Sequence, residues 1–162
     1  MGRKSMIIAL LLTALAVCLC AAAAAEVSGD YHYLVREDGT AVITHFSPLS
    51  SPDLRSGRFA VPSVIDGYTV TEIGDDAFNT SLRRTSRERS GITLIIPDTV
   101  RRIGNRAFSD CVIVENAVIP DSVVSIGDRA FAGCRLSSAV IPDSVSELDG
   151  NPFAGCGGRC PG

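Results

Sequence analysis

The stretch IPDSVVSIGDRAFAGC, residues Ile119–Cys134, recurs with small changes along much of the chain. Ile96–Cys111 reads IPDTVRRIGNRAFSDC, Ile141–Cys156 reads IPDSVSELDGNPFAGC, and Val61–Ser81 is a looser first copy that ends VTEIGDDAFNTS. The prolines of the three clear copies lie 23 and then 22 residues apart. A repeat of this length is typical of stacked coils in which each coil contacts only its neighbours.

Equivalent positions of stacked coils form ladders of like residues, because one coil cannot bury its apolar side alone. Gly74, Gly104 and Gly127 hold one position in three copies and are expected to turn the chain where a Cβ would be costly. The fourth copy has Asp149-Gly150 there, displaced by one residue. The ladders expected in the core are Ile96, Ile119 and Ile141, then Val100, Val123 and Val145, then Ile103, Ile126 and Leu148, and finally Phe108, Phe131 and Phe153.

The apolar run before each proline predicts a strand, over residues 92–96, 115–119 and 138–141. Proline ends each strand because it supplies no N–H to a sheet. Side chains alternate across a strand, so Thr93 and Ile95 face outward if Leu94 and Ile96 face the core. Binding and the plain suitability of β-branched residues for strands explain these outward rows equally well. The candidate binding face consists of Thr93, Ile95, Asn116, Val118, Ser138 and Val140.

The pattern IPxxVxxIGxxAFxxC resembles the BspA-like, or Treponema-type, leucine-rich repeat, and the resemblance covers roughly residues 58–156. It implies an α/β leucine-rich-repeat solenoid with short parallel strands and short helical turns, secreted or displayed on a cell surface. Members of this family are often bacterial surface proteins implicated in adhesion to host proteins or other cells. The family brings no catalytic residues with it.

Residues 1–25 are predicted to be a secretory signal peptide, with Arg3 and Lys4 before an apolar stretch too short to span a membrane. The small residues at its end place cleavage after Ala25, although an uncleaved anchor or a lipoprotein cleaved before Cys18 are alternatives. Removing Arg3 and Lys4 from the 15 basic residues leaves 13 against 18 acidic ones, a net charge of about −5. No general attraction to nucleic acid is expected, and membranes are met only through the export signal.

Residues 26–57 are expected to form an N-terminal cap and a loop, with a β-hairpin over residues 30–46 around Asp38-Gly39. A two-residue turn would place His32 opposite His45, Tyr33 opposite Thr44, and Leu34 opposite Ile43. One face of the hairpin would then cover the open end of the first coil, as terminal units of repeat arrays do. That face carries Tyr31, Tyr33, Val35, Val42 and Phe46.

The facing histidines are the one metal-like constellation in the sequence. Two imidazoles supply two of the four ligands of a structural zinc site, so neither a metal nor a cofactor is expected. Cys111, Cys134 and Cys156 hold one position in successive coils, where Ser81 stands in the first. Stacked side chains do not match disulfide geometry, so these cysteines are expected to be free, buried thiols. A bridge from Cys156 to Cys160 stays open as an alternative.

An insertion breaks the period, because Gly74 and Gly104 lie 30 residues apart where Gly104 and Gly127 lie 23 apart. The extra residues fall at 82–90, and insertions in repeat proteins map to loops that often bind partners. A solvated loop without a partner is the simpler interpretation. Arg101, Arg102 and Arg106 of the next coil would extend the basic patch. The arginines of the loop itself are Arg83, Arg84, Arg87 and Arg89.

Residues 58–156 are thus interpreted as four repeats, and residues 157–162 as the tail of an incomplete array. The sequence favours an exported, non-catalytic binding module for an extracellular protein or glycan, in adhesion or recognition. The alternative is a structural spacer, or a truncated fragment of a larger surface repeat protein, with end-to-end self-association. No Ser/His/Asp grouping or phosphate loop indicates an enzyme, and both histidines belong to the predicted hairpin. The sequence does not identify the ligand.

Overall fold

The computed structural model describes residues 25–48, 56–79, 81–82 and 91–156, and in these residues the chain forms strands and turns but no helix. The expected short helical turns are therefore not shown in this part of the chain. Residues 96–101 and 104–113 connect the strands of the second coil, and both segments form turns. Residues 1–24, 83–90 and 157–162, with most of the predicted signal peptide, the arginine loop and the tail, lie outside the described residues.

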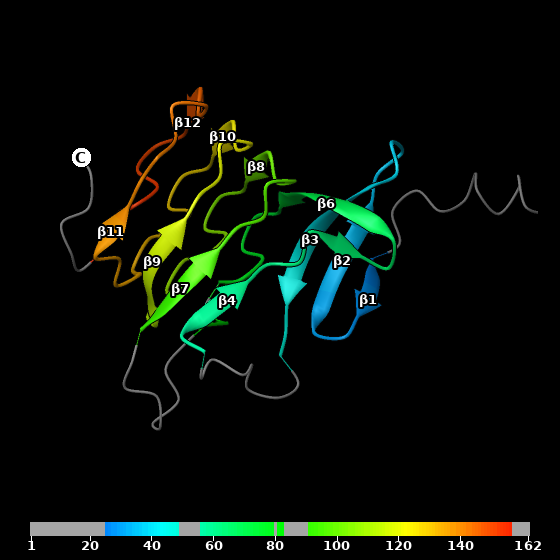
Figure 1. Ribbon diagram of the computed structural model, residues 1–162, viewed down its shortest axis with the longest axis horizontal. Coiled ribbons are helices and arrows are strands. Elements are labelled where there is room, and N and C mark those ends of the chain that lie inside the picture. Colours follow the sequence, from blue (N-terminus) through cyan, green and yellow to red (C-terminus); the bar gives the residue numbers. More distant parts are fainter. Residues whose placement is uncertain (1–24, 49–55, 80, 83–90, 157–162) are drawn as a thin grey trace, which may run out of the picture.

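Four parallel strands form one sheet, in the order β11-β9-β7-β4 (Figure 1). Three of them confirm the strands predicted before the prolines, with small differences at their ends. Burial alternates along β7 as predicted, since Ile92 and Leu94 are buried while Thr93 and Ile95 are half-buried. The strands of this sheet are β4 (Arg58–Ala60), β7 (Ile92–Ile95), β9 (Val114–Val118) and β11 (Ser138–Ala139).

A second sheet, of eight strands, was not foreseen as a sheet and runs β1-β2-β3-β6-β8-β10-β12, with β5 paired to β6. In its repeat part Ile73, Ile103, Ile126 and Leu148 pair in register from coil to coil. Each coil therefore gives one strand to each sheet. The strands are β1 (Glu26–Ser28), β2 (Tyr31–Val35), β3 (Thr40–Phe46), β5 (Val64–Ile65), β6 (Tyr68–Ile73), β8 (Arg102–Ile103), β10 (Ser125–Ile126) and β12 (Glu147–Leu148).

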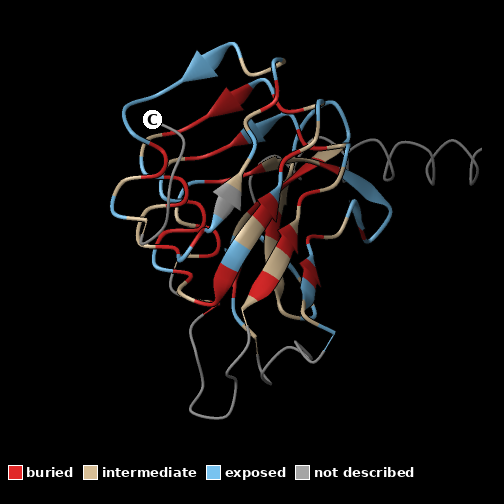
Figure 2. Ribbon diagram, turned by 60° about the vertical axis from the view of Figure 1, so that its left-hand side comes forward, coloured by how far each residue is buried: buried red, intermediate tan, exposed pale blue. Residues whose placement is uncertain are grey.

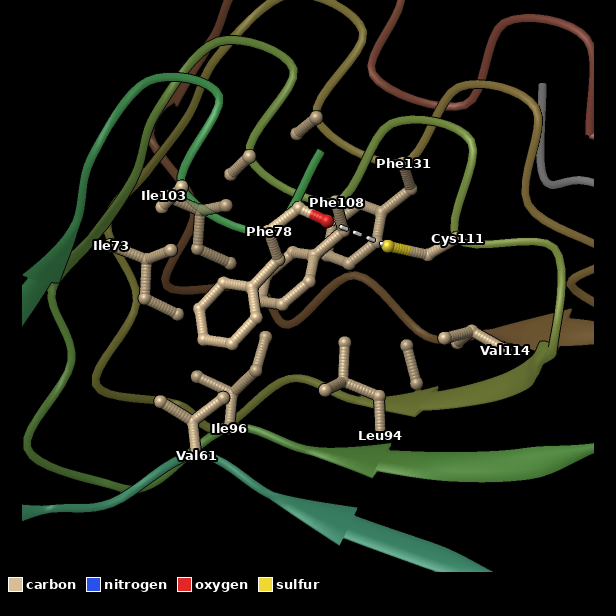
Figure 3. Close-up of a cluster of buried hydrophobic side chains, with 14 of the residues drawn as sticks. Val61, Ile73, Phe78, Leu94, Ile96, Ile103, Phe108, Cys111, Val114 and Phe131 are labelled. Atoms are coloured by element: carbon tan, nitrogen blue, oxygen red, sulfur yellow. Dashed lines mark hydrogen bonds between the residues drawn. The ribbon is translucent and has the colours of Figure 1, made fainter. Parts of the chain in front are cut away.

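A ladder of phenylalanine rings fills the space between the two sheets. Figure 3 shows Phe78 and Phe108 with Ile73 and Ile103 on one side and Leu94 and Ile96 on the other. The ring centroids of Phe78 and Phe108 are 4.9 Å apart, and those of Phe108 and Phe131, and of Phe131 and Phe153, are each 5.4 Å apart. The predicted phenylalanine ladder is confirmed. Such stacked pairs add to the stability that burial of the rings already provides.

The hairpin is present, but its predicted register is right only at its outer end. His32 pairs with His45 as predicted, whereas Tyr33 pairs with Ile43 and Leu34 with Val42. The loop has three residues, because Arg36 N–H donates to the Thr40 carbonyl (2.8 Å). Gly39 takes a left-handed conformation (φ 76°) in it, as in three-residue loops that close with a bulge.

This change of register moves the hairpin's core face by one residue on β3. Ile43 and Ala41, which pair with Tyr33 and Val35, are fully buried. Val42 was expected on this face and instead pairs with Leu34 on the other one. The shift ends between Tyr33 and His32, where Thr44 is the extra residue of a β-bulge.

Phe46, at the end of the hairpin, is the first rung of the phenylalanine ladder. Its ring stacks on that of Phe78 with centroids 5.1 Å apart. The N–H of Phe46 donates to the Ala77 carbonyl (2.7 Å), just as Phe78 N–H donates to the Ala107 carbonyl one coil further on (2.7 Å). β3 also pairs with β6 in parallel. The hairpin therefore continues the repeat pattern instead of merely covering its end.

The cysteine ladder is confirmed, and each thiol has a defined partner. Cys111 Sγ donates to the Phe78 carbonyl (3.1 Å), and Cys134 Sγ donates to the Phe108 carbonyl (3.2 Å). Ser81 Oγ makes the same bond to the Phe46 carbonyl (2.8 Å). Cys111 and Cys134 are free, buried thiols, and Cys156 is partly buried. Burial raises the pKa of Cys111 to about 12 and also raises the pKa of Cys134.

The repeated glycines are required by close packing of coils and not by their own backbone angles. None of Gly74, Gly104 and Gly127 has a positive φ. A Cβ on Gly104 would lie 2.6 Å from Asp75 N and 2.7 Å from Gly74 C, both backbone atoms of the preceding coil. The expected cost of a Cβ holds, but the reason is the approach of the neighbouring coil.

The last described coil departs from the predicted core. Ile103 and Ile126 are fully buried, whereas Leu148 in the same ladder is 49% exposed. Val145 and Ile141 are only partly buried, unlike Val123 and Ile119. Figure 2 shows the exposed β12 beside the buried β10. The prediction that Leu148 lies in the core is wrong, because no described coil packs on its outer side.

Candidate binding face

The outward side chains of the four-stranded sheet align in two rows. Thr93 pairs with Asn116, which pairs with Ser138, and this makes the polar row. Ile95 pairs with Val118 in the second row, which is aliphatic. Val118 is 51% exposed and Val140, just beyond β11, is 76% exposed. The structure thus brings Thr93, Ile95, Asn116 and Val118 together on one side of the sheet, and Ser138 continues the backbone register of Asn116.

The first coil adds two residues to these rows that sequence analysis missed. Arg58 pairs with Thr93 and Ala60 pairs with Ile95, and both are exposed. Arg58 therefore extends the polar row with a positive charge, and Ala60 extends the aliphatic row with a small side chain. The signal was present, because Phe59 and Val61 precede a proline as Leu94 and Ile96 do.

A β-bulge interrupts the pairing of β7 and β9 at the start of the face. Ile92 pairs with Val114 and Thr93 with Asn116, so Glu115 is an extra residue and its side chain is exposed. The carbonyl of Glu115 accepts two hydrogen bonds from Ser137, one from its N–H (2.8 Å) and one from its Oγ (3.1 Å). Bulges re-aim side chains at functional edges of sheets, and here the bulge adds a carboxylate beside the polar row.

The four arginines proposed for the basic loop, Arg83, Arg84, Arg87 and Arg89, lie outside the described residues. The first residue of the insertion, Leu82, is described and its side chain is buried. Two of the three arginines expected to extend the basic patch into the next coil form ion pairs. Arg102 pairs with Glu72 (3.4 Å), and Arg106 pairs with Asp76 (2.8 Å). Their charges are thus compensated locally.

Ion pairs on the eight-stranded sheet tie the hairpin to the repeats. Glu72 on β6 contacts Arg36 of the hairpin and Arg102 of the next coil. The Arg106 guanidinium, by hydrogen bonding, holds the pKa of Asp76 below its usual value. The arginines of these pairs are about half exposed, so each pair stabilises the fold only slightly.

Residues that could hold a metal are sparse. No group of three or more His, Cys, Asp or Glu side chains in the described part of the chain is arranged around a common point. The two histidines lie in register on β2 and β3, as predicted. Within the described ranges there is no helix long and apolar enough to cross a membrane.

Stacked coils, each with a short strand in a parallel sheet and a ladder of aliphatic and phenylalanine side chains, define a leucine-rich-repeat protein. A family model described as "BspA type Leucine rich repeat region (6 copies)" matches residues 71–158. This match spans more than half of the chain, and the protein belongs to the BspA-type leucine-rich-repeat family. The resemblance stated from the repeat motif is confirmed.

Solved structures of leucine-rich repeat proteins share this fold. One from Bacteroides capillosus is 26% identical with a TM-score of 0.65, and the match covers 86% of this chain and 100% of that one. One from Bacteroides ovatus is 29% identical with a TM-score of 0.64, covering 83% of this chain and 36% of that one. One from T. pallidum is 25% identical with a TM-score of 0.61, covering 78% and 54%. This chain thus spans about half or less of the last two. No curated protein sequence matches it.

Proposed function

We propose that this protein is an exported, non-catalytic solenoid that binds an extracellular protein or glycan through the outer face of its four-stranded sheet. The observation that carries the proposal is the aliphatic row beside a polar row, with Val118 and Val140 largely exposed. Exposed aliphatic side chains next to hydrogen-bonding groups are the composition of a binding surface. Family resemblance supports a location at the cell surface or outside the cell, where such a face would serve adhesion.

The rigidity of the face supports the same proposal. Its rows are set by backbone pairing between parallel strands, and the opposite sides of those strands pack into the core through Leu94 and Val114. Little side-chain and backbone freedom remains to be lost when a partner docks, which favours affinity. The mixed chemistry of Arg58, Thr93 and Asn116 offers both donors and acceptors to hydroxyl or amide groups of a ligand.

A binding screen with matched variants tests this proposal. The untagged protein would be applied to a printed glycan array and to a panel of immobilised extracellular matrix proteins. For any ligand found, Val118→Asp together with Val140→Asp should weaken binding by at least about tenfold, because charges would be buried against it. Val124→Asp is the matched control, since Val124 is also exposed but belongs to the segment just before β10 of the other sheet. Equal losses in both variants would contradict the proposed face.

The arginine loop is a second candidate contact for an acidic partner. Its four arginines stand against one acid in a chain with an excess of acidic residues. Replacing Arg83, Arg84, Arg87 and Arg89 by serine should reduce binding of anionic glycans and its dependence on salt. Unchanged binding at low salt would leave the loop without this role.

A spacer that associates end to end is the alternative function. The exposed Leu148 and the partly buried Val145 favour it, because a coil of another molecule could cover them. Light scattering over a wide range of concentration distinguishes the two functions. Mass that grows with concentration in the wild type and not in Leu148→Lys would support association; a constant monomer mass would exclude it.

A further inference from the structure

The chain has two histidines, and they face each other across one strand pair. His32 on β2 and His45 on β3 are directly opposite in register, with ring centroids 5.6 Å apart and ring planes at 65°. They lie on the outer face of the hairpin, because the neighbouring pair Tyr31 and Phe46 faces the core. Every imidazole of the protein is therefore concentrated at one point of its surface.

This point is open to solvent. His45 is exposed and His32 is half-buried. On the third strand, Val27 pairs with His32 and is itself 60% exposed. Among the described residues no bulky layer covers His45, and an aquated ion can approach it from outside. Thr44, the bulge residue, precedes His45 and sets how its side chain leaves the strand.

The separation of the rings fits a shared ion. An imidazole nitrogen binds a transition metal at about 2.0–2.1 Å, so two rings on one ion have centroids roughly 4.5–5.3 Å apart. The observed 5.6 Å needs only a small rotation of the side chains. We propose that His32 and His45 together bind one divalent transition-metal ion, Cu²⁺ in preference to Ni²⁺ and Zn²⁺, following the general order of affinities for nitrogen ligands.

The metal ion at this site would exchange with solution, because the protein supplies only two ligands. With no third His, Cys, Asp or Glu grouped around these rings in the described residues, water completes the coordination. Two protein ligands are too few for a structural zinc centre, which agrees with the interpretation from sequence. The thiols of Cys111 and Cys134 are buried, and the partly buried Cys156 follows β12, at the other end of the sheet from β2 and β3.

An ion at this site would tie β2 to β3 beside the first rung of the core. The adjacent pair is Tyr31 and Phe46, whose rings are 4.9 Å apart, and Phe46 stacks on Phe78. An ion that binds the folded hairpin and not the unfolded chain stabilises the fold by mass action. The metal would therefore strengthen the cap of the repeat array, and the melting temperature would report its binding.

The test is a calorimetric titration of the untagged chain with CuCl₂, NiCl₂ and ZnCl₂, alongside His32→Asn, His45→Asn and the double variant. One Cu²⁺ per chain is expected, with a rise in melting temperature. Each single variant should lose affinity by at least about tenfold, since even the outer partners of metal ligands contribute 10- to 100-fold. The double variant should bind the ion most weakly, but its loss should be smaller than the product of the two single losses, because both rings serve one ion. Circular dichroism confirms that the variants fold.

Three results would overturn the proposal. One is no binding to the wild type up to about 1 mM Cu²⁺. Another is equal affinity in the wild type and both single variants, which would place the ion elsewhere. The third is two ions per chain with half the sites lost in each single variant, which would make the histidines independent. These results leave the sheet-face proposal untouched, because the variants lie on the hairpin.

Discussion

The two ends of the repeat array differ in how their ladders are closed. At the N-terminal end, the hairpin places Phe46 on Phe78 and pairs β3 with β6, so Ile73 and Phe78 are fully buried. At the other end, Leu148 continues the same aliphatic ladder but is half exposed. The residue types are nearly the same, so the neighbouring coil and not the sequence of a coil decides its burial.

The largest expected difference concerns the phenylalanine ladder. Phe78→Ala should destabilise the fold by about 3–5 kcal/mol, because its ring is buried and stacks on rings to both sides. Phe153→Ala should cost roughly half of that, since Phe153 stacks on Phe131 alone among the described rings. Urea denaturation of both variants measures the two costs. Equal costs would show that the second stacking neighbour contributes nothing.

The aliphatic ladder gives the next comparison. Ile126→Ala should cost about 2–5 kcal/mol, because Ile126 is fully buried between Ile103 and Leu148. Leu148→Ala should change stability by no more than about 0.5 kcal/mol, as exposed positions usually do. The same denaturation experiment applies. A large loss for Leu148→Ala would mean that the last coil is covered in solution, for example by another molecule.

Substitutions at the repeated glycine position should show a smaller difference in stability between the two coils. Gly104→Ala should cost about 1–3 kcal/mol, since the new methyl group would press on the backbone of Asp75 and Gly74. Asp149 holds the equivalent position in the last coil and already carries a Cβ, so Asp149→Ala should cost less than about 0.5 kcal/mol. Thermal unfolding monitored by circular dichroism compares the two. Full tolerance of Gly104→Ala would refute close packing of the coils.

The buried thiol of Cys111 should make the stability of the fold depend on pH in the alkaline range, with no effect at neutral pH. The pKa of Cys111 is raised from 9.0 to about 12 by burial, so the unfolded chain releases this proton before the folded one. Its contribution to stability is complete below pH 9 and disappears as pH rises toward 12. Cys111→Ser should remove this part of the alkaline loss, because a serine can donate to the Phe78 carbonyl as Ser81 donates to that of Phe46.

Reactivity toward a thiol reagent checks the same point along the ladder. Cys156 is only partly buried and should be modified before Cys111 and Cys134, as mass spectrometry of peptides would show. Modification of all three at one rate in the folded protein would contradict the buried ladder.

Much of the repeat could be predicted because its strongest signals are local. An apolar run before proline fixed β7 and β9 to within one residue and set the outward rows. β8, β10 and β12 were missed because two residues carry no visible alternation, and their pairing comes only from stacking. The hairpin register failed by one residue because a loop of two or three residues can follow the same Asp38-Gly39 signal.

The candidate face was predicted less completely than the fold. Its central residues follow from alternation, but Arg58 and Ala60 belong to a first coil whose sequence departs from the others. The bulge at Glu115 depends on how two strands of unequal length pair, which neither strand shows alone. The exposure of Leu148 was missed because the ladder rule assumes a neighbour on both sides.

Native-state hydrogen exchange tests the central claim, that each described coil is held by the coils stacked on it. The amides to compare are those of Gly104, Gly127 and Asp149, which donate to the carbonyls of Ile73, Ile103 and Ile126. The account predicts that Gly104 and Gly127 exchange only through global unfolding and that Asp149 exchanges with a clearly lower opening free energy. Equal opening free energies at all three amides would contradict it.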